Sequence, residues 1–220
     1  MGTLGKPEDD ASNTFTARLL LLLESIPLLG ETAYQDITQK VISEYWKDYQ
    51  DHRGDFIPAF LTNDTLRMWR TFCVNYEART QSEPPEKKAK RKLKNLKLKH
   101  SRLLTCYSAL LYLLAIFSKS GTVGPNDAVS MIQLTPTQRL EWLASQEDLA
   151  AAHPRIKELL VSYENFLQLT NASEIELVSR FLDKDQSKKY FESAGRFGDL
   201  MFEVLDAIGG RNALHRLLVV

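Results

Sequence analysis

The feature that most constrains the fold of this chain is a junction between a cationic segment and an apolar one. Nine Lys and Arg residues lie between Lys87 and Arg102, and the run 103–117 that follows is almost wholly apolar. A helix needs about 20 apolar residues to cross a bilayer, whereas this run is shorter and contains hydroxyl and thiol groups. We therefore expect a helix buried in a protein core, and no membrane span.

The same helical spacing recurs along most of the chain. Apolar residues return every three or four positions, whereas strand-like alternation bounded by turns is nearly absent. With 220 residues, 44% of them hydrophobic, the chain can bury a sizeable core. The sequence predicts an all-α multi-helix bundle of about seven to nine helices. It also suggests two helical subdomains, 14–120 and 121–220, after a flexible lead at 1–13.

Caps and breakers place the predicted helices. Asn13 or Thr14 can cap the first helix, and Pro27 and Gly30 end it. The segment 80–92 carries two prolines and mixed charge, which predicts a mobile surface loop that turns helical near Leu93. The other predicted helices are 32–49, one capped near Thr62 or Asn63, one with Thr135-Pro136 at its start, and those near 153–169, 173–182, 186–208 and 211–220.

Charge is balanced over the chain but not along it. The 28 basic and 28 acidic residues argue against a protein that coats nucleic acid, because such binding needs an excess of cations. However, no Asp or Glu occurs between Lys87 and Asn126. Uncompensated like charges repel on a helix, which favours a phosphate-binding surface over a solvated face that only keeps the chain soluble. The side chains expected to point away from the core are Lys90, Arg91, Lys94, Lys97 and Arg102.

The helix before this segment has two different sides. Its predicted apolar side carries Leu66, Trp69, Cys73 and Tyr76, and its polar side carries Asn63, Arg67, Arg70 and Glu77. The polar row is either the lining of a ligand site or domain interface, or ordinary exposed helix surface. Spacing alone leaves both interpretations open.

No complete catalytic or metal site is recognisable. The four histidines are scattered without metal-ligand spacing, and no Gly-x-Ser-x-Gly turn is present. The glycines of 193–199 follow no strand, so they do not predict a phosphate loop. Cys73 and Cys106 read as buried thiols of a reducing compartment, and residues 1–13 do not resemble a secretory signal. We predict a cytoplasmic protein without catalytic residues, metal ligands or cofactor.

Two alternatives remain beside a binding domain. Arg211 and His215 are similar in spacing to the Arg-to-His pair of all-α ribonucleases of the HEPN type, although the interval here is shorter. That alternative is a metal-independent ribonuclease. The other alternative is an interaction module whose partner is a protein.

Three stretches, 9–25, 60–77 and 97–102, resemble a known bacterial family. They are similar to the helical region that follows the catalytic domain in nucleotidyltransferase-domain proteins of the polymerase-beta-like superfamily. In that family the catalytic domain carries a Gly-Ser motif and metal-binding aspartates, which two-metal phosphate chemistry requires. This chain contains neither, so the resemblance implies an accessory domain that does no chemistry by itself.

The resemblance also implies roles for particular residues and partners. Asn63, Arg67, Asn75 and Glu77 would shape a wall that faces a nucleotidyltransferase domain in cis or in trans. The side chains that would meet nucleotide phosphate, RNA or an acidic acceptor are Lys94, Lys97, Lys99 and Arg102. With Arg70 from the polar row, these nine residues are the candidate ligand-binding set.

Overall fold

The computed structural model describes residues 14–77 and 84–219. The chain is 82% helical, and its described residues include no strand. The prediction of an all-α multi-helix bundle is therefore confirmed. The side chains of Asn75, Tyr76 and Glu77 lie outside the description, as does the proposed cap at Asn13.

The chain begins with α2 (Thr14–Leu23) and α3 (Glu31–Tyr45), followed by a short 3-10 helix, Tyr49–Asp51. The connection between α2 and α3 contains Pro27 and ends at Gly30, whose φ of 68° lies in the left-handed region that favours glycine. The second predicted helix, 32–49, ends earlier than expected, at Tyr45.

α4 (Ala59–Glu77) begins three residues before the predicted cap. Thr62 does not cap this helix, because its hydroxyl donates back to the carbonyl of Pro58 (3.1 Å) from within the first turn. The prediction of a start at Thr62 or Asn63 was wrong because Ser and Thr side chains can bond a carbonyl one turn earlier as well as cap.

The cationic segment and the apolar run that follows it form one continuous helix. It comprises α5 (Pro85–Lys97), a π-helical turn (Leu98–Arg102) and α6 (Leu103–Ser120). The predicted surface loop is therefore wrong for 85–92, because Pro85 occupies the first helical turn, where a missing N–H costs nothing. Residues 80–83 of that loop lie outside the described residues.

The second half of the chain adds six helices: α7 (Pro125–Ile132), α8 (Pro136–Ser145), α9 (His153–Thr170), α10 (Glu174–Leu182), α11 (Lys184–Gly209) and α12 (Ala213–Val219). A further 3-10 helix spans Glu147–Leu149. Thr135 caps α8 as predicted, since its hydroxyl accepts from the backbone N–H of Gln138 (3.3 Å). Residues 193–199 lie inside α11, with no strand before them among the described residues.

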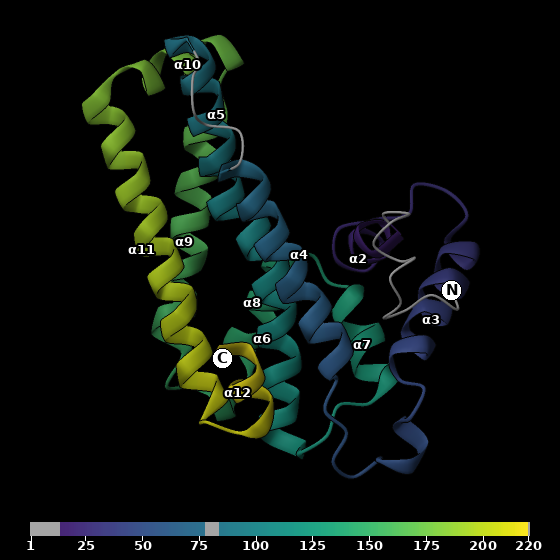
Figure 1. Ribbon diagram of the computed structural model, residues 1–220. Coiled ribbons are helices and arrows are strands. Elements are labelled where there is room, and N and C mark those ends of the chain that lie inside the picture. Colours follow the sequence, from purple (N-terminus) through teal and green to yellow (C-terminus); the bar gives the residue numbers. More distant parts are fainter. Residues whose placement is uncertain (1–13, 78–83, 220) are drawn as a thin grey trace.

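Two hydrophobic cores stabilise the bundle, and both draw on residues from before and after position 120. The main core centres on α6, whose inner residues pack against α2, α4, α8 and α11. The second core joins α5 to α9, α10 and the first half of α11. Figure 1 shows α10 and α5 at one end of the molecule, α11 running from that end toward the other, and α2, α3 and α7 grouped to one side.

The stretch Pro85–Ser120 is, by length and composition, the one helix among the described residues that could cross a membrane. However, 72% of its apolar window is buried inside the fold. Core helices meet the same criterion, so this helix is weak evidence for a membrane span.

Candidate functional site

The predicted cationic surface lies on one face of α5 and the π-helical turn. Lys90, Lys94, Lys97 and Ser101 follow each other at spacings of four, three and four residues, which places them on one side of a helix. Lys90, Lys94 and Lys97 are exposed, whereas Leu93 and Leu96 are buried in the second hydrophobic core. We call Lys90, Lys94, Lys97 and Arg102 the basic ridge.

Two hollows flank the basic ridge, and Lys94 and Lys97 line both. The smaller hollow, about 150 Å³, faces α10 and is also lined by Lys90 and Glu174. The larger hollow, about 590 Å³, faces α4 and the end of α2. Its other lining residues are Glu24, Phe72, Leu98, Ser101 and Arg102. The cationic side chains therefore border concave surface on both sides.

Carboxylates hold the two outer cations of the ridge. Lys90 Nζ lies 3.1 Å from Glu174 Oε1, and Arg102 Nη1 forms an ion pair with Glu24 Oε2. The Arg102 guanidinium also lies over the Phe72 ring, 5.3 Å from its centroid. Among the described residues, no ion pair engages the two central lysines, Lys94 and Lys97. The centre of the ridge is its uncompensated part.

The remaining predicted site residues are not gathered at these hollows. Lys99 projects toward α11, with its Nζ 5.6 Å from the centroid of the Phe191 ring. Arg67 covers the Phe15 ring at 3.8 Å. Asn63, Arg67 and Arg70 are exposed on α4 and line neither hollow. Asn75 and Glu77 belong to the last turn of α4, and the structure does not describe their side chains.

Two residues that the sequence did not predict line the larger hollow beside the basic ridge. Phe72 supplies an aromatic wall and Glu24 supplies a carboxylate from a helix end 78 positions away in sequence. Phe72 could have been noticed as an aromatic residue one position from the predicted apolar stripe of α4. No sequence signal places Glu24 beside Arg102.

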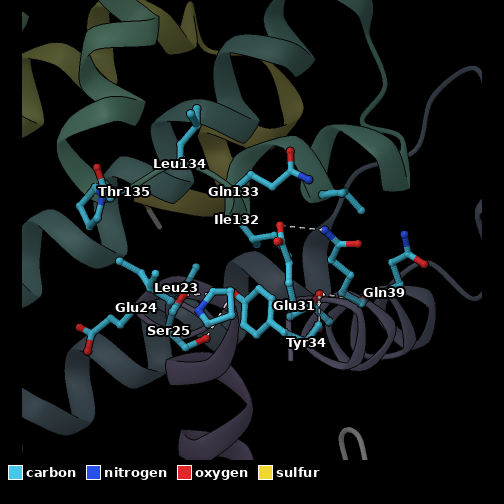
Figure 2. A pocket seen from close by; sticks show the side chains of 16 residues that line it. Leu23, Glu24, Ser25, Glu31, Tyr34, Gln39, Ile132, Gln133, Leu134 and Thr135 are labelled. Carbon is cyan, nitrogen blue, oxygen red and sulfur yellow. Dashed lines mark hydrogen bonds between the residues drawn. The ribbon is translucent and has the colours of Figure 1, made fainter. Parts of the chain in front are cut away.

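A second concave site was not predicted at all. A cleft of about 490 Å³ lies between α3 and the turn that joins α7 to α8, and the connection between α2 and α3 closes one end. Figure 2 shows Glu24 and Gln39 at opposite ends of this cleft. Leu23 and Ile132 supply buried apolar floor. The polar lining is Glu24, Ser25, Glu31, Tyr34, Gln35, Thr38, Gln39, Gln133 and Thr135.

Hydrogen bonds order part of the cleft wall. The Tyr34 hydroxyl donates to the carbonyl of Ser25 (3.0 Å), and Gln35 Nε2 donates to Glu31 Oε1 (3.3 Å; Figure 2). In the described part of the chain, the side-chain amides of Gln39 and Gln133 have no hydrogen-bond partner. These two amides can serve a ligand as donors and as acceptors.

A buried arginine supports the floor of the cleft. Arg139, on α8, donates to the carbonyls of Met131 (3.0 Å) and Leu23 (3.3 Å) and to Ser108 Oγ (3.4 Å). Burial lowers the pKa of Arg139 to about 10, because desolvation disfavours the charged form. At neutral pH the guanidinium therefore remains charged, and its three acceptors come from three different parts of the chain.

The predicted ribonuclease pair lies at the far end of α11. His215 is 4% exposed and packs against Gly209, and neither ring nitrogen has a hydrogen-bond partner within the described residues. Arg211 is exposed, with a positive φ of 62°. A buried imidazole cannot contact RNA in solvent without local opening, so this geometry does not favour a catalytic pair.

Metal ligation and thiol chemistry concern the described His, Cys, Asp and Glu side chains. Over residues 14–77 and 84–219, no group of three or more His, Cys, Asp or Glu side chains could hold a metal ion. Cys106 is buried, and desolvation raises the pKa of its thiol to about 12. A thiol with that pKa is protonated at neutral pH and is a poor nucleophile.

Comparison of the chain with protein-family models, with curated proteins and with solved structures finds no match.

Proposed function

We propose that this chain is a non-catalytic helical binding module that holds a phosphate-bearing ligand, a nucleotide or single-stranded RNA, on the basic ridge. The observation that carries the proposal is the position of Lys94 and Lys97. Both lysines line two hollows, and neither is engaged by an ion pair among the described residues. Ammonium groups beside concave surface can approach phosphate oxygens from two sides.

The shape of the ridge favours a ligand with several phosphates over a single one. Lys90 and Arg102 are 12 positions apart, which corresponds to roughly 18 Å along a helix. One phosphate would meet only the central lysines, whereas a linear polyanion could also reach the outer cations. Phe72 lies in the larger hollow, where an aromatic ring can stack on a base of a single strand.

The test compares binding of fluorescent adenosine triphosphate and of short single-stranded RNAs of increasing length, measured by anisotropy at several salt concentrations. The variant is Lys94→Ala/Lys97→Ala. The matched control is Lys40→Ala/Lys157→Ala, which removes two exposed lysines from other helices. The ridge variant should bind RNA more weakly than the control and lower the salt slope by about 1.4, since each single-strand phosphate contact contributes about 0.7.

Equal RNA affinity in the ridge variant and the control would refute the proposal. If the chain binds adenosine triphosphate, but binds long RNAs no more tightly than short ones, the ligand would be restricted to a mononucleotide.

The association with a nucleotidyltransferase domain stays a prediction that follows from the resemblance. The neighbouring gene sequence offers a direct check. A strand-rich domain with a Gly-Ser motif and paired aspartates encoded immediately upstream would support the association.

A further inference from the structure

The connection between α2 and α3 exposes apolar side chains at the mouth of the cleft. Ile26, Leu28 and Leu29 are 69%, 94% and 93% exposed, and Ile26 also lines the cleft. Single exposed apolar residues are normal on protein surfaces. Three within four positions beside a concave site are instead typical of interaction surfaces. We call these three residues the apolar lip.

The cleft behind the lip combines apolar floor with unused hydrogen-bonding groups. Leu23 and Ile132 can pack against apolar side chains, while the amides of Gln39 and Gln133 offer both donors and acceptors. A polypeptide segment presents the same combination of apolar side chains and backbone donors and acceptors. A small ligand could fill the cleft, but it would leave Leu28 and Leu29 exposed. A protein segment can cover both features.

The charge of the cleft selects among protein segments. Two carboxylates, Glu24 and Glu31, line it, and none of its lining residues is Lys, Arg or His. Glu24 is already engaged by Arg102, so Glu31 is the carboxylate that a partner would meet. Its contact among the described side chains is the amide of Gln35. This polarity opposes nucleic acid and anionic lipid, and it complements a lysine or arginine.

We infer that the apolar lip and the cleft form a docking surface for a segment of another protein that carries apolar side chains and at least one Lys or Arg. The apolar side chains pack against the lip and the cleft floor, and the cation lies near Glu31. This surface is separate from the basic ridge except for Glu24, which lines both the cleft and the larger hollow. The inference therefore does not depend on phosphate binding.

The probe is a library of random linear peptides displayed on phage, selected against the full-length chain. Selected peptides are then synthesised, and their affinity is measured by fluorescence anisotropy. Three variants are compared with the wild type: Leu28→Ser/Leu29→Ser, Glu31→Gln and the control Ile175→Ser. Ile175 is 85% exposed on α10 and lies in a different part of the fold. All four positions are exposed, so the substitutions leave the core intact.

The expected peptides combine apolar residues with Lys or Arg. Their affinity should fall about tenfold or more in Leu28→Ser/Leu29→Ser, because apolar anchors dominate binding energy. It should fall several-fold in Glu31→Gln, with a weaker salt dependence than the wild type, and should not change in Ile175→Ser.

Several outcomes would overturn the inference. They are failure to select any peptide, selection of acidic peptides, and a peptide affinity that is the same in the wild type and in Leu28→Ser/Leu29→Ser. Two parallel measurements examine other occupants. Sedimentation of the chain with phosphatidylcholine and phosphatidylglycerol vesicles would assign the lip to lipid if it required Leu28 and Leu29. Concentration-dependent dimerisation that the same variant abolishes would assign it to a second copy of the chain.

Discussion

Glu24 and Arg102 lie 78 positions apart in sequence, and their side chains form an ion pair at the boundary between the cleft and the larger hollow of the basic ridge. Glu24 lines both concave sites, whereas Arg102 lines only the hollow. The pair is partly exposed, with 27% of the glutamate and 39% of the arginine side chain accessible. A phosphate that binds Arg102 has to compete with this carboxylate.

The first prediction follows from that competition. If the basic ridge binds phosphate, Glu24→Gln should raise the affinity for single-stranded RNA by about two- to fivefold, since partly exposed ion pairs contribute up to about 1 kcal/mol. The measurement is the anisotropy titration used for the ridge. Glu31→Gln is the matched control, because it removes the same charge from the cleft but does not line the hollow.

Equal affinity changes in Glu24→Gln and Glu31→Gln would show that only net charge matters, which contradicts direct competition. Absence of RNA binding by the wild type would instead count against the function proposed for the ridge.

The second prediction concerns two glycines of α11. A methyl group added at Gly209 would lie closer than 3.0 Å to the buried His215 ring, whereas one at Gly195 would meet nothing within 4 Å. Gly209→Ala should therefore lower the free energy of unfolding by about 1–3 kcal/mol through overpacking. Gly195→Ala should raise it by about 0.5–1 kcal/mol through helix propensity. Urea denaturation measures both, and a stabilised Gly209→Ala variant would disprove the close packing of His215.

The third prediction concerns Arg139, whose guanidinium joins α8 to Met131, Leu23 and Ser108. Arg139→Ala should cost about 3–5 kcal/mol of unfolding free energy, because it leaves a cavity and removes the side-chain donor to the buried carbonyl of Leu23. Arg139→Met should cost less, because its side chain fills much of the volume that alanine leaves empty. Equal losses in the two variants, measured by chemical denaturation, would argue against a packing contribution from this side chain.

The fourth prediction is a pH dependence of stability that originates at His100. The ring stacks on Phe166 at 4.3 Å and on Phe197 at 5.0 Å, and its Nδ1 contacts the carbonyl of Leu96 (3.0 Å). Burial lowers the pKa of His100, while the Leu96 hydrogen bond opposes the shift. The unfolded chain therefore binds a proton near pH 6.5 that the folded chain does not bind until lower pH. Stability from this group is present above about pH 6.5 and is lost as the pH falls.

His100→Leu should remove this dependence. Between pH 7.5 and 5.5 the wild type should lose more unfolding free energy than the variant, by up to about 1.4 kcal/mol per pH unit below the unfolded pKa. Urea denaturation at both pH values gives the two losses. Because the other histidines are present in both proteins, the difference isolates His100, and identical losses would contradict the prediction.

Local signals in the sequence predicted much of the fold. Thr135-Pro136 predicted the start of α8 because an N-cap hydroxyl and a first-turn proline act within one turn of the helix. Where a local signal has two solutions, the prediction was less accurate. Thr62 can cap a helix or bond the preceding turn, and Pro85 can interrupt a chain or begin a helix. In both cases the helix begins earlier than predicted, α4 at Ala59 and α5 at Pro85.

The candidate site divides in the same way. Helical spacing placed Lys94 and Lys97 together on an exposed face, and the structure has them there. The same spacing predicted that Arg102 points away from the core, but it could not predict that Glu24 engages the guanidinium. The resemblance grouped Lys99 with Lys94, Lys97 and Arg102, yet Lys99 lies against Phe191 on α11. Adjacent residues on a helix point in different directions, so closeness in sequence is a poor guide to a shared site.

By itself, the sequence determined that this chain is helical, where most of its helices lie and which faces of those helices are apolar, because these properties arise from interactions within a few residues. Only the tertiary structure decided that Glu24 meets Arg102, that Arg139 bonds Leu23 across 116 positions, and that a cleft opens behind the apolar lip. Contacts of that kind depend on how whole helices pack against each other, and helical periodicity carries no information about which helices become neighbours.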